Sequence, residues 1–349
     1  MGQAISIVFA GASVAAVASQ PALCAKMLDA LSRWTGYNAP GGLWRIAAIL
    51  LALANLKNLP FVWHLRFIHA LVYHIYLQPT PIPPHALFQP LITSTRTPML
   101  ETDYNLHKSN STYFSDMDIS RSHLFTAILR NGIKKNSRLY GAKKSAVAGA
   151  VGATHGTRGR HVIALGGVSC LFKREILPYT GYEMWTRILC WDRKWFYLIT
   201  HLVKPGVGKP SAWTLQPWRK AKTTSSSSMS SEIDREKFMG AVYATGIAKY
   251  VVKRGRITVP PEQALLDAEM LPVKPPGWVY RGETEAIGSA ADEVLPQSVE
   301  AKDWNWDMIE KERLRGLEVA QKFADMDGMH EYFDGGKNGA LGEYADWLF

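Results

Sequence analysis

The order of the periodic segments constrains this chain most, because one long helix is followed by several strand-like runs in close succession. From Asn110 onward, apolar residues recur at helical spacing, which predicts an amphipathic helix that ends near Gly132 or Gly141. Three β-rich runs come after it: His161 to Leu177, Tyr182 to Trp191 and Trp195 to Lys204. A helix must therefore share its core with neighbouring strands.

The strand-like runs predict an antiparallel sheet. Trp191 to Trp195 forms a tight hairpin between two of them, and Trp195 to Val203 is apolar at nearly every position, which is typical of a strand covered on both faces. A first strand at Leu91 to Thr97 precedes the helix, and a last strand at about Phe238 to Arg254 follows. We expect an α+β fold in which an antiparallel sheet wraps around a long central helix.

A main domain at about residues 86–268 is predicted, because the proline-rich run at 78–84 is typical of a stiff linker. Residues 1–85 form an apolar N-terminal extension, and residues 269–349 a partly helical, acidic C-terminal extension. The smaller predicted segments are a Gly-, Ala- and Ser-rich loop at Gly141 to Gly159, a mobile Ser-rich insertion at about 205–235, a short helix at Val259 to Leu266 and a helix around Trp306 to Phe323.

The N-terminal extension leaves its relation to a membrane open. Ile5 to Ala18 makes a weak signal peptide, and Met1 to Ser6 fits the loose N-myristoylation pattern. Leu43 to Leu59 falls short of the about 20 apolar residues that a spanning helix needs. Phe61 to Leu77 resembles an interfacial amphipathic helix, and a helix packed on the body of the protein explains it equally. Membrane association, peripheral or anchored through this region, is therefore one of two interpretations.

Charge and cysteine content narrow the class of protein. The formal charge is +10, but residues 121–222 hold 19 Lys/Arg against 3 Asp/Glu, whereas residues 281–349 hold 7 against 16. This pattern suits an anionic ligand, an anionic membrane surface or contact between the two segments, and no motif favours nucleic acid. Three widely spaced cysteines predict neither disulfides nor a zinc site, so an intracellular, reducing compartment is the default.

One polar run lies between the first predicted strand and the helix: Glu101-Thr102-Asp103-Tyr104-Asn105-Leu106-His107. It resembles, with the residues that follow, the Asp-x-Asn-x-His-x-x-Asn-x-x-Tyr signature of hotdog-fold acyl thioesterases, and is most similar to the THEM6-like branch and its fungal relatives. The matching residues are Asp103, Asn105, His107, Asn110 and Tyr113. The resemblance continues through Cys170 to Arg174 and Tyr182 to Tyr197, and so covers about residues 90–265. It implies a homodimer of side-by-side domains with sites near the interface.

A thioester carbonyl needs a base or nucleophile and positive potential on its oxygen, and the start of a helix supplies the latter. Asp103 is the candidate to activate water or attack directly, Asn105 to position water or substrate, and His107 to act as acid, base or hydrogen-bond donor. Polar residues before a helix are also ordinary caps, and Ser109 or Asn110 is the expected N-cap. Asp103 and His107 lie too far upstream to cap that helix.

Candidate substrate-binding residues are Asn110, Tyr113, Lys173 and Arg174. The basic middle segment, which includes Lys173 and Arg174, could attract the phosphates of coenzyme A or the acidic face of a carrier protein, although solvated strand edges explain it as well. We interpret Asp116 and Asp118 with Arg121 as helix-surface or structural ion pairs. His64, His69 and His74 are expected to be surface or packing residues, and Cys170 and Cys190 to lie in the core.

The resemblance implies an enzyme that hydrolyses an acyl thioester of coenzyme A or of an acyl carrier protein, in fatty-acyl or polyketide-type metabolism, without a metal or bound cofactor. The absence of a Gly-x-Ser-x-Gly elbow excludes the serine-hydrolase type, and no Gly-Lys-Ser/Thr follows the glycines near 149–156 to make a P-loop. Two alternatives remain open: a hotdog hydratase or dehydratase, and a non-catalytic acyl-binding protein associated with a membrane.

Overall fold

The computed structural model of the chain divides into two compact units. The smaller comprises residues 1–62 and 98–101, and the larger comprises residues 63–97 and 102–349. Within them the structure describes residues 21–37, 39–137, 161–208, 210, 212–219, 236–280, 304–332 and 340–345. The predictions made for 1–20 and for Gly141 to Gly159, and most of the Ser-rich insertion predicted at about 205–235, including residues 220–235, fall outside the described residues.

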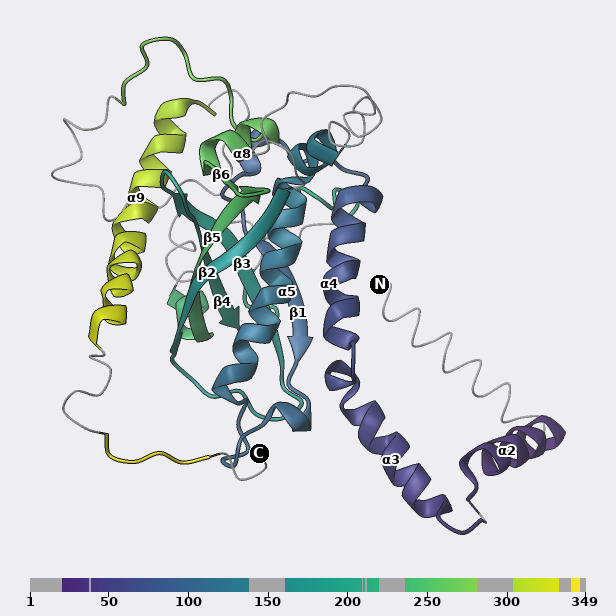
Figure 1. The fold of residues 1–349 in the computed structure, drawn as a ribbon. Coiled ribbons are helices and arrows are strands. Elements are labelled where there is room, and N and C mark those ends of the chain that lie inside the picture. The colour runs from purple at the N-terminus through teal and green to yellow at the C-terminus, as the bar shows by residue number, and fades with distance from the viewer. Residues whose placement is uncertain are drawn as a thin grey trace, which may run out of the picture. The chain divides into compact units, whose positions relative to one another are not determined.

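The larger unit is built on an antiparallel sheet of six strands in the order β1-β3-β4-β5-β2, with β6 added to β5 (Figure 1). The strands are β1 (Leu91–Arg96), β2 (His161–Phe172), β3 (Gly181–Trp191), β4 (Phe196–Val203), β5 (Val242–Arg254) and β6 (Ile257–Val259). β2 lies at the edge of the sheet, and no other described strand pairs with its outer side. The predicted antiparallel sheet is confirmed.

The β3–β4 hairpin shows how the local sequence sets the strand register. Asp192 Oδ1 accepts hydrogen bonds from the backbone N–H groups of Lys194, at 2.7 Å, and Trp195, at 2.6 Å. A side chain that binds its own backbone in this way replaces part of a turn. The chain therefore reverses at once, and Trp191 pairs with Phe196, as the hairpin pattern predicts.

Helix α5 (Asn110–Ile128) lies against β1 and β3 on one face of the sheet (Figure 1). The apolar side chains in its C-terminal half share a core with the strands, and members of this core include Leu124, Phe125, Ile188 and Phe196. The helix ends earlier than predicted, at Ile128, because the backbone leaves the helix at Leu129. Residues 130–137 then form a second helical stretch.

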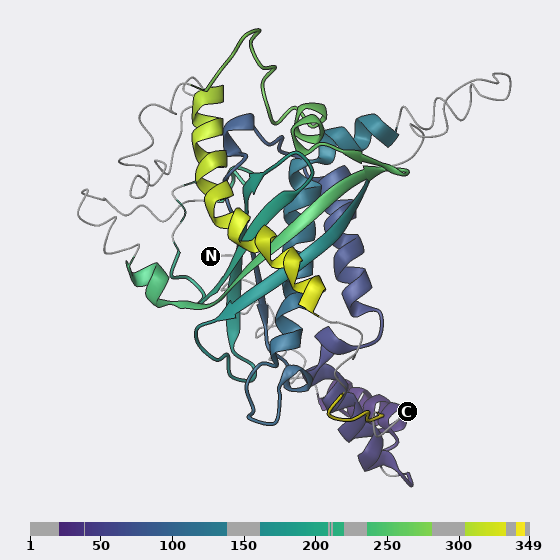
Figure 2. The same ribbon diagram turned by 60° about the vertical axis from the view of Figure 1, so that its left-hand side comes forward.

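Helix α9 (Trp306–Ala324), predicted at almost these bounds, covers the opposite face of the sheet (Figure 2). A Cβ on Gly316 would lie 2.2 Å from the carbonyl oxygen of Leu189, so only glycine allows α9 to approach β3 this closely. Arg187 of β3 forms an ion pair with buried Glu312 of α9 at 3.0 Å. The basic and acidic segments of the chain thus contact each other here. α9 leads into η7 (Asp325–Tyr332).

A second helix, α4 (Val62–Val72), lies beside α5 in the larger unit, apart from its first residue, and continues as a π-helix, η2 (Tyr73–Leu77). The Trp63 indole N–H donates to the Ser115 carbonyl at 3.4 Å, and His74 Nε2 lies 2.9 Å from His123 Nδ1. The prediction of a single helix at 61–77 is wrong in its last turn, because residues 73–77 form a π-helix. One face of α4 packs on the protein body, as one of the two interpretations expected.

The smaller unit contains α2 (Pro21–Thr35), α3 (Gly42–Ala54), η1 (Leu56–Asn58) and η4 (Met99–Glu101). Buried Asn55 ends α3, where its amide donates to the Leu51 carbonyl and its Oδ1 accepts from Leu100 N–H, each at 2.9 Å. Lys57 and Glu101 form an ion pair at 2.9 Å. Among the described residues, no helix has the length and apolar character needed to cross a membrane.

Other predicted boundaries need correction. β2 ends at Phe172 instead of Leu177, because Lys173 and Arg174 both donate their N–H groups to the Tyr243 carbonyl and the chain leaves the ladder. β5 begins at Val242 because residues 236–240 are helical. β6 was not predicted. The short helix is present as α8 (Pro261–Asp267), and η3 (Pro84–Ala86) follows the proline-rich run.

Candidate active site

The predicted reactive residues lie in a tight turn between β1 and α5. Thr102 and Lys108 form an isolated antiparallel bridge that closes this turn, and Asp103 N–H donates to the His107 carbonyl at 2.9 Å. Leu106 takes a left-handed conformation, with φ of 59°, which an apolar residue adopts only when the surroundings impose it. We call residues 102–108 the reactive turn.

The Asp103 side chain holds the reactive turn together. Its Oδ1 accepts hydrogen bonds from the backbone N–H groups of Asn105, at 2.9 Å, and His107, at 3.3 Å. Its other carboxylate oxygen, Oδ2, accepts no hydrogen bond from the described residues. Because one oxygen is fixed by the backbone, the second is held in a defined position and remains available to a ligand.

Helix α5 begins directly after the reactive turn. Ser109 occupies the N-cap position, as predicted for Ser109 or Asn110, but its side chain makes no capping hydrogen bond. Its hydroxyl lies 3.2 Å from the Ser111 hydroxyl instead, and Asn110 is exposed. The first N–H groups of a helix carry partial positive charge, so the α5 N-terminus favours an oxyanion.

His107 faces the segment that follows β2. Its Nε2 lies 3.3 Å from Glu175 Oε2, and both side chains are partly exposed. The next residue, Lys108, donates its backbone N–H to the Ile176 carbonyl at 2.8 Å. Sequence analysis missed Glu175, because nothing in its local sequence links it to a histidine 68 residues earlier; its only signal is its position beside Lys173 and Arg174.

Tyr113 lies beside the reactive turn, on the first turns of α5. The ring is buried, and burial, together with Cys170, Tyr243 and Asp103 nearby, raises the pKa of its hydroxyl far above the ordinary value. The phenol therefore stays protonated at neutral pH and can donate a hydrogen bond. Its ring also makes an edge contact with Phe172 at the end of β2, at a centroid distance of 5.0 Å.

Lys173 and Arg174 are exposed and follow β2 at this same end of the sheet. Their backbone N–H groups donate to the Tyr243 carbonyl at 2.8 and 2.9 Å. Through Tyr243 and Glu175 they lie near the reactive turn, but the Lys173 ammonium donates to the Met239 carbonyl at 3.3 Å and not to Asp103 or His107. The structure thus groups the predicted residues at one end of the sheet, with the two cations at the rim.

Beneath the reactive turn lies a buried charged group around Asp116, which we call the Asp116 cluster. Asp116 is fully buried, and its carboxylate accepts from the Lys108 ammonium at 2.9 Å, from the Tyr182 hydroxyl and from the Arg66 guanidinium at 3.4 Å. The interpretation of Asp116 as part of a structural ion pair is therefore confirmed, whereas a helix-surface position and Arg121 as its partner are wrong, since its partners come from three other segments. Only the neighbouring pair is local: Arg121 binds Asp118 at 3.0 Å.

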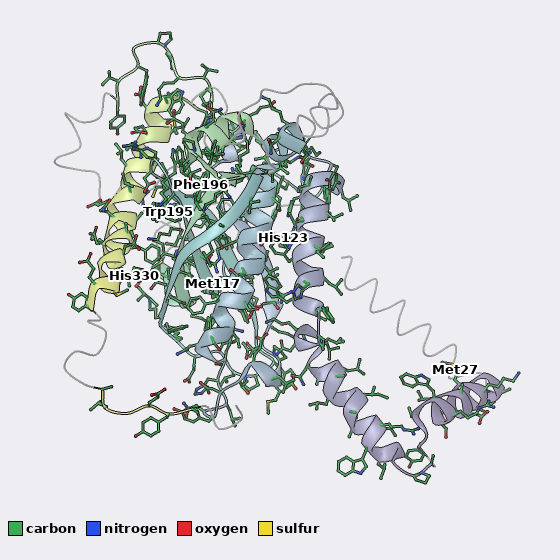
Figure 3. All side chains as sticks on the ribbon, in the orientation of Figure 1. Met27, Met117, His123, Trp195, Phe196 and His330 are labelled. Carbon is green, nitrogen blue, oxygen red and sulfur yellow. The ribbon has the colours of Figure 1, made fainter. Side chains whose placement is uncertain are left out.

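A second buried group joins α5 to η2. The pKa values of His74 and His123 are both lowered to about 4, chiefly by burial and also by nearby cationic or titratable groups, including His69. Figure 3 labels His123 on α5. Both imidazoles are therefore neutral at pH 7, in a packing role as expected for His74. No cluster of three or more His, Cys, Asp or Glu side chains in the described part of the chain could hold a metal ion.

Residues 97–236 match the family model described as the thioesterase-like superfamily. Thioesterase poxG of Penicillium oxalicum is 33% identical over 313 residues, which cover 86% of this chain and 92% of that protein. Thioesterase lcsJ of Purpureocillium lilacinum is 30% identical over 336 residues, which cover 82% and 95%. The chain belongs to the thioesterase-like superfamily.

This thioesterase therefore carries the hotdog-type α+β fold that its motif implied, and it is an acyl-thioester hydrolase. The solved gentisyl-coenzyme A thioesterase BH1999 is 17% identical, with 51% of this chain and 98% of that chain covered and a TM-score of 0.29. The family match covers residues 97–236 and so includes the whole reactive turn, helix α5 and strands β2, β3 and β4.

Proposed function

We propose that this thioesterase cleaves acyl thioesters of coenzyme A or of an acyl carrier protein with Asp103 as the central catalytic residue, in a catalytic domain at about residues 86–268. The observation that carries the proposal is the geometry of Asp103. One carboxylate oxygen is fixed by two backbone N–H groups, and the other is unoccupied by the described residues beside His107 and Tyr113. A carboxylate placed in this way is preorganised to accept a proton or to attack.

The chemistry follows from these positions. In one route, Asp103 takes a proton from a water molecule, and the water oxygen attacks the thioester carbonyl carbon. In the alternative route, Asp103 attacks the carbonyl carbon directly and forms an acyl anhydride, which water then cleaves. The oxyanion is stabilised by the N–H groups at the start of α5. The C–S bond breaks, and His107, beside Glu175, supplies a proton to the leaving thiolate.

The remaining predicted residues take positioning roles. Asn105 and Asn110 are exposed at the reactive turn and the α5 start, where their amides can hold water or the substrate. Tyr113 keeps its proton and offers a hydrogen-bond donor. Lys173 and Arg174, exposed at the rim, provide cations for the phosphates of coenzyme A or of a carrier protein's prosthetic arm.

A homodimer joined through β2 fits this site. β2 is an edge strand, and its large apolar side chains Val162, Leu165, Leu171 and Phe172 are exposed. An unpaired edge of this kind is a template for pairing with a second chain. Because Phe172 contacts Tyr113, pairing along β2 would put the site near the dimer interface. We also propose a role in fatty-acyl or polyketide-type metabolism, as the resemblance of the motif to fungal thioesterases implies.

The test is thiol release from short, medium and long acyl-CoAs by the wild type and by Asp103→Asn. Asparagine keeps an oxygen that can accept both backbone N–H groups, but it removes the carboxylate charge. Asp192→Asn is the matched control, because Asp192 binds two backbone N–H groups in the same way at the far end of β3. We expect at least about a 100-fold loss of turnover for Asp103→Asn, as removal of a general base causes, and none for Asp192→Asn.

The outcome that contradicts the proposal is equal turnover by Asp103→Asn and the wild type. Loss of turnover in both variants would assign Asp103 a structural role in the turn. Thiol release also separates hydrolysis from hydration of an enoyl thioester, which changes the absorbance of the acyl group without releasing a thiol.

A further inference from the structure

Two helices carry large apolar side chains that no described residue covers. Along α4 and η2 the residues facing away from α5 recur at helical spacing, and Leu65, Ile68 and Val72 of α4 and Tyr76 of η2 are between 41% and 71% exposed. The opposite face holds Trp63 and Arg66, which bind Ser115 and Asp116 of α5. One face of α4 is therefore docked and the other is an apolar stripe in solvent, which marks an interaction surface.

Helix α3, in the smaller unit, is apolar around its circumference. Leu43, Trp44, Leu50, Leu51 and Leu53 are all more than half exposed, and they lie on different sides of the helix. A helix of 13 residues is only about 20 Å long, which is shorter than the about 30 Å of a hydrocarbon core. Its length suits a helix that lies in a lipid interface. We call this surface and the α4 stripe the apolar helix faces.

The charge of this region points to one partner. Residues 30–100 contain no Asp or Glu and five Lys or Arg residues. Lys57 and Arg66 pair with Glu101 and Asp116 inside the protein, whereas Arg33, which pairs with Asp29, and Arg45 are exposed. Exposed Trp34, Tyr37 and Trp44 flank α3 or begin it. Aromatic rings and cations beside an apolar helix match the headgroup region of a bilayer, whose cytoplasmic leaflets carry negative charge.

We propose that the apolar helix faces bind the surface of an anionic lipid bilayer, and that α3 in the smaller unit and the outer face of α4 in the larger unit each contribute to this binding. Exposed leucines and tryptophans insert among the upper acyl carbons, and the exposed Arg33 and Arg45 stay beside the lipid phosphates. This binding does not depend on how Asp103 cleaves a thioester, so the two proposals succeed or fail separately.

The experiment is flotation of the full chain on a density gradient with phosphatidylcholine vesicles, with and without phosphatidylserine. One triple variant changes the α4 stripe, Leu65→Gln, Ile68→Gln and Val72→Gln, and another changes α3, Trp44→Ser, Leu50→Gln and Leu53→Gln. The matched control replaces three exposed valines elsewhere, Val273→Gln, Val279→Gln and Val319→Gln. Thiol release from a short, water-soluble acyl-CoA checks that each variant is folded.

We expect the wild type and the control to float with the phosphatidylserine vesicles at least about tenfold more than with pure phosphatidylcholine, a preference that basic residues near the surface produce and added salt reduces. Each triple variant should lose most of its flotation while keeping its turnover. The proposal is overturned if the wild type floats with neither vesicle. It also fails if both triple variants float like the control, or if the α4 variant changes the mass measured by light scattering, which would assign that face to a second copy of the chain.

Discussion

Replacement of Lys108 by methionine tests whether the Asp116 cluster supports the reactive turn. The Lys108 ammonium and the Asp116 carboxylate are both fully buried and 2.9 Å apart. Removing one partner of such a pair leaves a buried charge and costs about 3–5 kcal/mol. Asp116 keeps Arg66 and the Tyr182 hydroxyl, so we expect the lower end, about 3 kcal/mol.

The loss is measured by urea unfolding of Lys108→Met, Asp116→Asn and the double variant. For a domain of this size, 1 kcal/mol shifts Tm by about 2–4 °C, so about 3 kcal/mol corresponds to a fall of about 6–12 °C. The double variant should cost less than the sum of the single variants by about 2 kcal/mol, because neither buried charge is then left alone.

Two results would refute this reasoning. One is a change within about 0.5 kcal/mol for Lys108→Met, the usual effect of a surface substitution. The other is strict additivity in the double variant, which would mean that the two side chains do not interact. The conservative Asp118→Asn exchange serves as a comparison, because its partner Arg121 is local to the helix and Asp118 is partly exposed.

Two further predictions concern the packing around the sheet and α5. The pKa values of His74 and His123 are about 4 in the folded protein and near 6.5 in the unfolded chain. The unfolded chain therefore takes up protons first, and the free energy of unfolding falls as the pH drops from 6.5 toward 4. Urea unfolding at several pH values should show this slope, and a variant with both histidines replaced by glutamine should lose it. A Cβ on Gly166 would lie 2.2 Å from the Trp195 ring, so Gly166→Ala should lower the free energy of unfolding by about 1–3 kcal/mol. A Cβ on Gly167 would instead meet the end of the Lys249 side chain at 3.1 Å, so Gly167→Ala should lower Tm clearly less. Equal Tm values for the two variants would contradict this.

Hydrophobic periodicity was sufficient to predict the secondary structure that buries apolar residues. The hairpin after Trp191 and the helix from Trp306 were correct because an Asx turn and an amphipathic repeat are both written in the local sequence. The break at Leu129 was not predicted, because neither Gly nor Pro marks it. The π-helix at Tyr73–Leu77 has the same apolar spacing as an α-helix, so its extra residue per turn leaves no sequence signal.

The residues of the candidate site also differ in whether the local sequence could predict them. Asp103, Asn105 and His107 could be selected from the sequence because they lie within five consecutive residues. Asp116 was misjudged because helical spacing suggested Arg121 as its partner, whereas the fold brings Tyr182 to it from 66 residues away. Glu175 was missed for the same reason. Contacts between segments far apart in the sequence depend on how the elements pack together, which no local pattern encodes.

The spacing of Asp103, Asn105 and His107 has a geometric cause as well as a chemical one. Asp103 Oδ1 binds the backbone N–H groups at positions two and four residues later, which are those of Asn105 and His107. An insertion or deletion between them would therefore open the reactive turn and misplace all three side chains together. Substituting Asn105 by alanine leaves its backbone N–H in place, so any loss of turnover would report on the amide alone. Alanine at Asp103 would remove the turn and the carboxylate at once, and asparagine is the exchange that separates the two.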